Sequence, residues 1–211
     1  MAPGPGLPMN RTLVAAALLT ACSDFVSVAE YDQLPPLPQL DFSRVTPAGE
    51  FHLWELREAS FAEPHLVIGR GGTADRNSLD PALVAAFDAA MPSFGFGEGC
   101  PPGDCFRYFI SLEGNEIRIW STAEAARAFL GTIDHLVEAA LMASAEGYHW
   151  RDTRETSGGR ITPDGFELVV LKIVSYCTPV QTDRFVLVVS AIGEIEIVRS
   201  QVWTKANEAC I

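Results

Sequence analysis

Three β-type runs close together near the C-terminal end constrain the fold of this chain most. Residues 166–177, 184–191 and 194–203 are rich in β-branched and aromatic residues. The turns between them are short, one at Thr178-Pro179 and one at Ile192-Gly193. Short connections join strands that are antiparallel neighbours. The sequence therefore predicts a three-stranded antiparallel meander in this region.

Helix signals precede the meander. Asp80 followed by Pro81 is typical of a helix start, with Asp as the N-cap and proline at the first helical position. Ser121-Thr122-Ala123-Glu124 has the form of a capping box. Apolar residues then recur at helical spacing over 129–141, with a pause at Gly131. We expect one helix after Asp80 and a longer, interrupted one after Ser121.

Further strands are predicted before and between these helices. Residues 51–57 and 65–68 have the composition of short strands, and residues 106–112 and 116–120 predict a hairpin. We therefore expect an α+β fold, in which helices pack on an antiparallel sheet that includes the C-terminal meander. The glycine-rich run Gly69-Arg70-Gly71-Gly72 follows a predicted strand, as phosphate loops do, but no Gly-Lys-Ser/Thr follows it. A flexible loop is the simpler interpretation.

The N-terminal region has the pattern of an export signal. Arg11 precedes an apolar stretch over 13–19, which is too short to cross a bilayer as a helix. The run Leu19-Thr20-Ala21-Cys22 resembles the lipobox of bacterial lipoproteins. The resemblance implies that the peptide before Cys22 is removed and that Cys22 is lipidated. The alternatives are an ordinary signal peptide and a buried helix start. Met9-Asn10-Arg11 is also a more usual signal start than Met1.

The resemblance suggests a division of the chain into three parts. Residues 1–21 are the lipoprotein signal peptide, residues 22–49 are the lipidated N-terminus and a proline-rich tether, and residues 50–211 form a single α+β domain. The run Leu34-Pro35-Pro36-Leu37-Pro38 favours polyproline II, which would act as a stiff spacer. In similar lipoproteins, a residue such as Ser23 after the cysteine implies the outer membrane, facing the periplasm, where the host has one.

The charge of the chain bears on its partners. The formal net charge is −12, and a strongly acidic chain repels phosphate backbones and anionic lipid surfaces. We therefore expect no nucleic-acid partner. The expected partners are the membrane, through the lipid on Cys22, and an envelope protein. No second apolar stretch has the length of a membrane-spanning helix.

Four cysteines remain when Cys22 is assigned to the lipid: Cys100, Cys105, Cys177 and Cys210. An even number in an exported chain predicts disulfides, and a four-thiolate zinc site would usually have two Cys-x-x-Cys pairs. We predict the pairs Cys177–Cys210 and Cys100–Cys105. In a three-stranded meander the first and third strands run the same way, so Cys177 and Cys210 belong at one end of the sheet.

Candidate catalytic residues are few. His135 and Glu138 have helical i, i+3 spacing, and His149 and Asp152 lie where a helix is expected to end. Either pair could serve acid–base or metal chemistry, but a solvated helix face and a charged surface loop are the simpler explanations. No nucleophile, metal or cofactor motif is present. We expect a non-enzymatic, lipid-anchored envelope protein that acts as a binding or structural module. The alternative is a membrane-tethered hydrolase or metal-dependent enzyme that uses His135/Glu138 or His149/Asp152.

Overall fold

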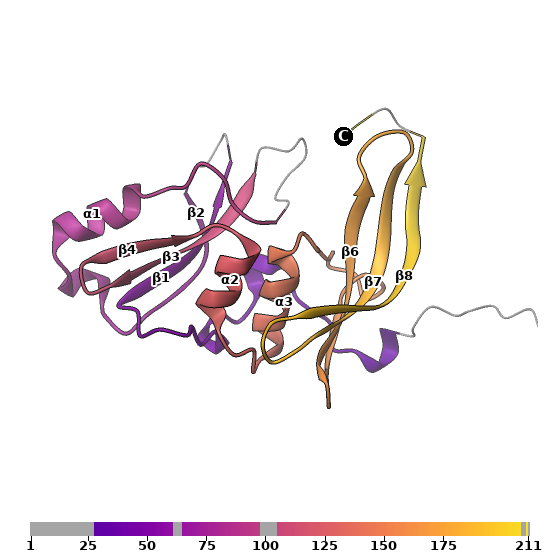
Figure 1. Cartoon of the computed structure of the whole chain (residues 1–211), viewed down its shortest axis with the longest axis horizontal. Helices are drawn as coiled ribbons and strands as arrows, with labels where there is room; N and C mark the ends of the chain where they lie inside the picture. Colours follow the sequence, from indigo (N-terminus) through magenta and orange to yellow (C-terminus); the bar gives the residue numbers. More distant parts are fainter. Residues whose placement is uncertain (1–27, 61–64, 98–104, 208–209, 211) are drawn as a thin grey trace, which may run out of the picture.

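The chain folds into two four-stranded antiparallel sheets with two helices between them (Figure 1). The computed structural model describes residues 28–60, 65–97, 105–207 and 210. The first sheet has the order β2-β1-β3-β4 and the second the order β5-β6-β7-β8. The strands are β1 Leu53–Ala59, β2 Leu66–Gly71, β3 Phe106–Glu113, β4 Glu116–Trp120, β5 Gly158–Thr162, β6 Gly165–Ser175, β7 Val180–Val189 and β8 Ile195–Ala206. The predicted α+β class and the C-terminal meander are confirmed.

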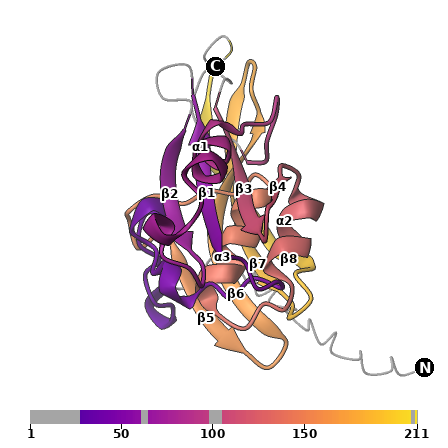
Figure 2. The same cartoon turned by 90° about the vertical axis from the view of Figure 1, so that its left-hand side faces the viewer.

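Three α-helices and four short 3₁₀ helices accompany the sheets. They are α1 Pro81–Ala89, α2 Ala123–Leu130 and α3 Leu136–Ala145, with η1 Val28–Glu30, η2 Leu37–Gln39, η3 Phe42–Arg44 and η4 Arg76–Ser78. Helices α2 and α3 lie between the sheets, and α1 covers the other face of the first sheet (Figures 1 and 2). No helix among the described residues is long and apolar enough to cross a membrane.

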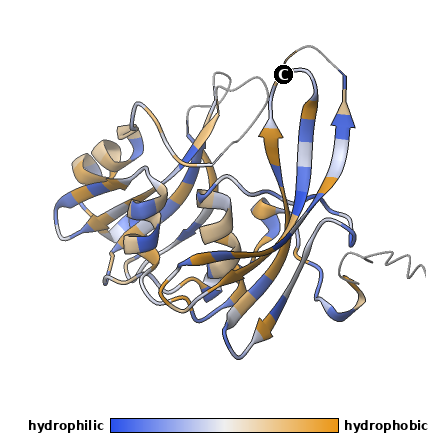
Figure 3. Ribbon diagram, turned by 45° about the vertical axis from the view of Figure 1, so that its right-hand side comes forward, coloured by the Kyte–Doolittle hydropathy of each residue, from blue (hydrophilic) through white to orange (hydrophobic). Residues whose placement is uncertain are grey.

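The main core joins both sheets to α2 and α3. Phe109 of β3 stacks on Phe129 of α2 with 4.3 Å between ring centroids, and Leu168 of β6 and Leu187 of β7 approach the same cluster from the second sheet. Eight consecutive residues of α3, from Glu138 to Ala145, are buried. Because both sheets and α2 surround this helix, its buried residues are mostly small and apolar, and they are not confined to one face. Figure 3 shows this apolar colouring along α3.

The stretch assigned to the tether is packed onto the domain from Val28 onward. Leu34, Leu40 and Val45 are buried in the main core. Trp150 donates from Nε1 to the carbonyl oxygen of Pro35 at 2.8 Å, and Ser157 donates from Oγ to the carbonyl oxygen of Leu34 at 2.7 Å. Leucines between the prolines supply apolar side chains, so burying them is more favourable than an extended spacer. Residues 1–27, including the predicted signal and Cys22, lie outside the described residues.

Several local expectations need correction. The helix cap after β4 is Thr122 rather than Ser121, because the Thr122 hydroxyl accepts from the Ala125 N–H at 3.0 Å. Gly131 has a φ of 68°, and it ends α2 rather than interrupting one long helix. Two strands also differ from the predicted ones: β5 lies before the meander, where no strand was predicted, and β2 extends into the glycine run.

The glycine run is a packed strand rather than a flexible loop. Gly69 and Gly71 lie in β2. A Cβ atom at Gly69 would come within 2.3 Å of the Phe42 ring, and one at Gly71 within 2.6 Å of the Trp54 ring. Glycine is therefore required at these positions because aromatic rings pack directly on the backbone.

Candidate functional site

A pocket opens between the helices and the edge strand β8, and we call it the β8 pocket. Its volume is about 210 Å³, which is smaller than the roughly 300–1,000 Å³ of pockets for drug-sized ligands. Its lining comes from four parts of the fold: α2, the C-terminal end of α3, β6 and β8. The lining residues are Arg127, Glu146, Tyr148, Lys172, Ile195 and Ile197.

Three of these residues, Glu146, Tyr148 and Lys172, meet at the C-terminal end of α3. Glu146 is the C-cap of α3, and Gly147 follows with a φ of 83°, a conformation that glycine adopts readily. Lys172 of β6 donates from Nζ to the carbonyl oxygen of Glu146 at 2.8 Å. A cation at a helix C-terminus also interacts favourably with the helix dipole. Lys172 Nζ lies 4.6 Å from the centroid of the Tyr148 ring, so it has both a carbonyl and an aromatic face as partners.

Arg127 supplies a second cation from the last turn of α2. Its Nη2 lies 3.6 Å from Glu146 Oε1, which is an ion pair beyond hydrogen-bond length. Within the described part of the chain, its buried Nε has no hydrogen-bond partner. A Cβ atom at Gly193 would lie 3.0 Å from Arg127 Cγ, so the turn before β8 packs closely on this side chain. The buried Nε is closed to solvent, but the Arg127 side chain is 37% exposed, so its Nη groups can donate to a ligand.

The charge and the walls of the β8 pocket define what it can hold. Arg127 and Lys172 carry two positive charges against the one negative charge of Glu146. Burial, with a smaller effect from Glu146, raises the pKa of Tyr148, so its hydroxyl stays neutral. Ile195 and Ile197 form an apolar wall, and Ile197 is 53% exposed. The arrangement fits an anionic group with a short apolar chain.

The structure gives the residues of the predicted pair His135 and Glu138 different surroundings. Glu138 is fully buried, and its carboxylate accepts from the backbone N–H groups of Thr46 at 2.8 Å, Asp134 at 2.9 Å and His135 at 3.1 Å. The His135 ring is partly exposed, and its Nε2 lies 3.7 Å from Asp134 Oδ1. The Glu138 carboxylate therefore holds the start of α3 and the N-terminal segment in place.

The residues of the second predicted pair, His149 and Asp152, each contact another part of the fold. The backbone of His149 pairs with that of Leu171, with hydrogen bonds of 2.8 and 2.7 Å. Asp152 is exposed, and its carboxylate accepts from Gln33 Nε2 at 3.1 Å. Neither of the predicted pairs lines the β8 pocket. No group of three or more His, Cys, Asp or Glu residues suited to a metal ion occurs in the described residues.

The predicted pair Cys177–Cys210 is confirmed, whereas the pair Cys100–Cys105 stays a prediction. Cys177 and Cys210 form a disulfide across 33 residues of sequence. This bridge joins the tip of the β6–β7 turn to the chain that follows β8, as the meander predicted. Cys105 is also disulfide-bonded, and Cys100, its predicted partner, lies outside the described residues.

Beyond the helices, β6, β7 and β8 continue as an arm that ends at this disulfide (Figure 1). Figure 3 shows apolar bands on the arm. Four exposed apolar or aromatic residues lie there: Val174, Tyr176, Val202 and Trp203. Sequence analysis identified neither the arm nor the β8 pocket. The one local signal was Lys172, which is the charged residue within the apolar run 168–174 of β6.

Comparisons with protein-family models, with curated proteins and with solved structures found no match. The interpretation of the site therefore depends on its own geometry and chemistry.

Proposed function

We propose that the protein is a lipid-anchored binding module of the cell envelope that takes a small amphiphilic anion in the β8 pocket. The resemblance of Leu19-Thr20-Ala21-Cys22 to a lipobox supports the anchor. The proposed ligand class is supported by the position of Arg127 and Lys172 beside the apolar wall of β8. By the same resemblance, the anchor lies in the outer membrane, facing the periplasm, where the host has one.

The pocket has partners for both the anionic group and the apolar chain of such a ligand. A carboxylate or phosphate oxygen can accept charge-assisted hydrogen bonds from the Arg127 guanidinium and the Lys172 ammonium. The apolar chain of the ligand then lies against Ile195 and Ile197 and leaves water. The Glu146 carboxylate repels a second negative charge. A monoanion with a short chain is therefore preferred over a dianion or a neutral alcohol.

Binding of octanoate by the purified protein tests this proposal, measured by calorimetry or by NMR shifts. We expect octanoate to bind more tightly than octanol, which lacks the charge, and than acetate, which lacks the chain. Arg127→Gln should weaken binding by roughly tenfold to a hundredfold, because a hydrogen bond to a charged group contributes about 1.5–3 kcal/mol. Arg118→Gln is the matched control, since Arg118 is an exposed arginine on β4 paired with Glu116. Equal binding of octanol, or full binding by Arg127→Gln, would refute the ligand.

Cys22→Ser tests the anchor. Incorporation of a labelled fatty acid should be lost in the variant, while the domain keeps its melting temperature. Labelling of the variant at the wild-type level would refute lipidation at Cys22. An uncleaved signal can hold some precursor at the membrane, so acylation itself, rather than membrane fractionation, is the measurement.

The enzymatic alternative has its own test. If the protein is a binding module, His135→Ala and His149→Ala should leave the cellular phenotype of the wild type intact. Loss of function in either variant at an unchanged melting temperature would favour a membrane-tethered hydrolase or metal-dependent enzyme. The Glu138 carboxylate accepts hydrogen bonds from three backbone N–H groups, and this structural role supports the non-enzymatic proposal.

A further inference from the structure

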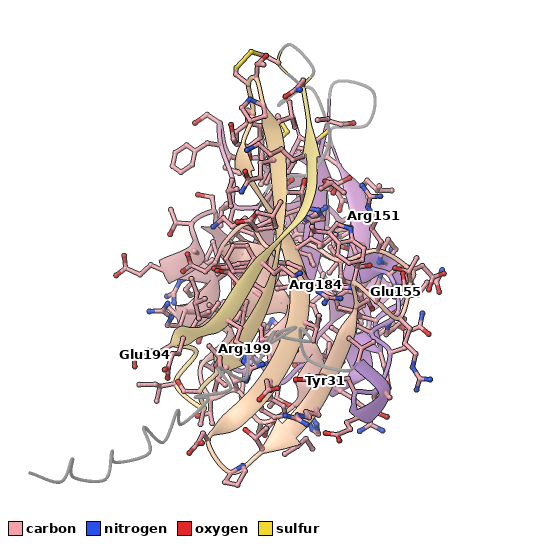
Figure 4. The ribbon with its side chains drawn as sticks, turned by 90° about the vertical axis from the view of Figure 1, so that its right-hand side faces the viewer. Tyr31, Arg151, Glu155, Arg184, Glu194 and Arg199 are labelled. Atoms are coloured by element: carbon pink, nitrogen blue, oxygen red, sulfur yellow. A yellow bond between two sulfur atoms is a disulfide. The ribbon has the colours of Figure 1, made fainter. Side chains whose placement is uncertain are left out.

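The N-terminal segment is fixed on one particular face of the molecule. This is the face of the second sheet that points away from α2 and α3, and we call it the outer face (Figure 4). Asp32 pairs with Gly159 of β5 through two backbone hydrogen bonds of 2.9 and 2.8 Å. Tyr31 is 2% exposed and packs with Val28 on Val169 and Val186. The described part of the chain therefore begins at Val28, on the outer face.

Two side chains and a glycine hold Tyr31 in this position. Its hydroxyl donates to the Glu167 carboxylate, and the Arg160 guanidinium carbon lies 4.6 Å from its ring centroid. A Cβ atom at Gly158 would lie 2.8 Å from Tyr31 Cβ. The close approach of the segment to β5 therefore requires glycine at 158. The position of the segment around Tyr31 is therefore set by side-chain packing as well as by backbone pairing.

The chain between Val28 and the proposed lipid is short. Six residue steps separate Cys22 from Val28. At about 3.6 Å per step, a fully extended chain reaches about 22 Å. The lipidated cysteine therefore stays within about 22 Å of Val28, whatever conformation these residues adopt.

The opposite side of the molecule lies further away than this reach. The second sheet, the α2/α3 layer, the first sheet and α1 follow one another (Figure 1). Successive packed layers are about 10 Å apart, so α1 lies about 30 Å from the outer face. A link of six residues cannot pass around these layers and place α1 on the bilayer.

We infer that the outer face of the second sheet lies against the membrane that holds the lipid. This inference rests on the lipid anchor proposed above. Helix α1 and the first sheet then face away from the bilayer.

The charges of the outer face are compatible with a bilayer surface. By strand register, Arg160, Glu167, Val188 and Glu196 form one row on this face, and Val169, Val186 and Arg199 form another. Arg184 and Glu30 lie beside these rows, and Figure 4 shows Arg151, Glu155 and Glu194 on the same side of the molecule. Together these residues are four arginines and five glutamates, so the face is close to neutral. The whole chain has a net charge of −12, so an anionic membrane repels this face less than the rest of the surface.

Trp203 gives this face an interfacial side chain. The Arg184 guanidinium carbon lies 5.0 Å from its ring centroid, and Trp203 is 36% exposed. Tryptophan with arginine is a combination favoured at membrane–water interfaces. Figure 4 shows Arg184 and Arg199 on the same face as Tyr31.

Tryptophan fluorescence of the full, acylated protein tests the orientation. The protein is reconstituted in phosphatidylethanolamine–phosphatidylglycerol vesicles that carry a nitroxide on the lipid headgroup, which quenches nearby tryptophans. We expect Trp203→Phe to remove most of the quenching. Trp120→Phe is the matched control, because Trp120 lies on β4 of the first sheet, and it should leave the quenching intact.

A spacer variant separates the orientation from the anchor. A Gly-Ser insertion of about 12 residues after Asp24 behaves as a flexible coil, so it should keep acylation and lose the quenching of Trp203. Acylated wild-type protein whose quenching is unaffected by Trp203→Phe, or is removed by Trp120→Phe, would overturn the orientation alone. Absence of acyl chains would overturn the anchor, and the orientation with it.

Discussion

Arg57 and Glu55 form a buried ion pair on the face of β1 that α1 covers, with 2.7 Å between Nη2 and Oε2. Arg57 is 1% exposed and Glu55 is 4% exposed. The Arg57 guanidinium also donates to the carbonyl oxygens of Phe87 at 3.2 Å and Ala90 at 3.3 Å, and its carbon lies 4.9 Å from the Phe87 ring centroid. This one side chain joins the C-terminal end of α1 to the first sheet.

Arg57→Met should therefore destabilise the protein strongly. The change leaves the Glu55 carboxylate buried with fewer partners, which typically costs about 3–5 kcal/mol of unfolding free energy. Urea unfolding measures the loss. Arg118→Met, at an exposed ion pair, should change stability much less, because solvent screens such pairs. The double variant Glu55→Leu with Arg57→Met should recover part of the loss. A loss in Arg57→Met no larger than that in the exposed control would contradict this account.

The disulfide between Cys177 and Cys210 should matter for global stability. It closes a segment across 33 residues, and on the loop-entropy model it contributes about 3.8 kcal/mol. The double variant Cys177→Ser with Cys210→Ser should lower the melting temperature accordingly, because the chain after β8 is no longer joined to the tip of the arm. Non-reducing peptide mapping of the wild type should recover the Cys177–Cys210 peptide. Recovery of a Cys105–Cys210 peptide would contradict the pairing.

The meander and its disulfide could be predicted from sequence because their determinants are local. The turns at Thr178-Pro179 and Ile192-Gly193 limit the strands on either side to antiparallel neighbours. Strand direction then places Cys177 and Cys210 at one end of the sheet. The start of α1 could be predicted for the same reason, since the Asp80 carboxylate accepts from the Ala82 N–H at 2.7 Å.

Helix α3 marks a limit of such local patterns. Its buried residues run consecutively from Glu138 to Ala145, because two sheets and α2 enclose it. Amphipathic spacing assumes a helix with one solvated side. The sequence therefore does not separate α3 from α2, and Glu138 resembles a surface carboxylate although it is fully buried.

The β8 pocket is non-local for a different reason. Arg127, Glu146 and Lys172 lie on α2, at the end of α3 and on β6, and no short spacing relates them. They meet because α2 and α3 end near the same part of the second sheet. That relation depends on the packing of both helices, which sequence periodicity does not specify. The burial of the proline-rich segment is also non-local, since Leu34 and Leu40 pack against core residues that are distant in sequence.

Glu138 should make stability depend on pH in a direction that can be checked. Burial raises the pKa of this carboxyl above its ordinary value of 4.5, although three backbone N–H groups act in the opposite direction. The folded protein therefore holds this proton more tightly than the unfolded chain does. The stabilising contribution is complete below pH 4.5 and is lost as the pH rises through the raised value.

Comparison with Glu138→Gln isolates this effect, because glutamine does not titrate. The stability of the wild type relative to the variant should be greatest near pH 4 and should decrease toward pH 7, as measured by urea unfolding at each pH. A relative stability that increases over this range would mean that the backbone N–H groups outweigh burial and that the pKa is lowered.

Tyr31 should control the attachment of the N-terminal segment to the outer face. Tyr31→Ala removes a buried aromatic ring from Val169 and Val186, and truncation of a buried ring typically costs about 3–5 kcal/mol. We expect limited proteolysis to cleave the variant within residues 28–35, where the wild type resists. Tyr31→Phe is the matched control, because it keeps the ring under Arg160 and loses only the hydrogen bond to Glu167. This control should lose about 1–3 kcal/mol of unfolding free energy and stay resistant to proteolysis. Equal resistance of Tyr31→Ala would show that the backbone pairing of Asp32 with Gly159 holds the segment without the ring.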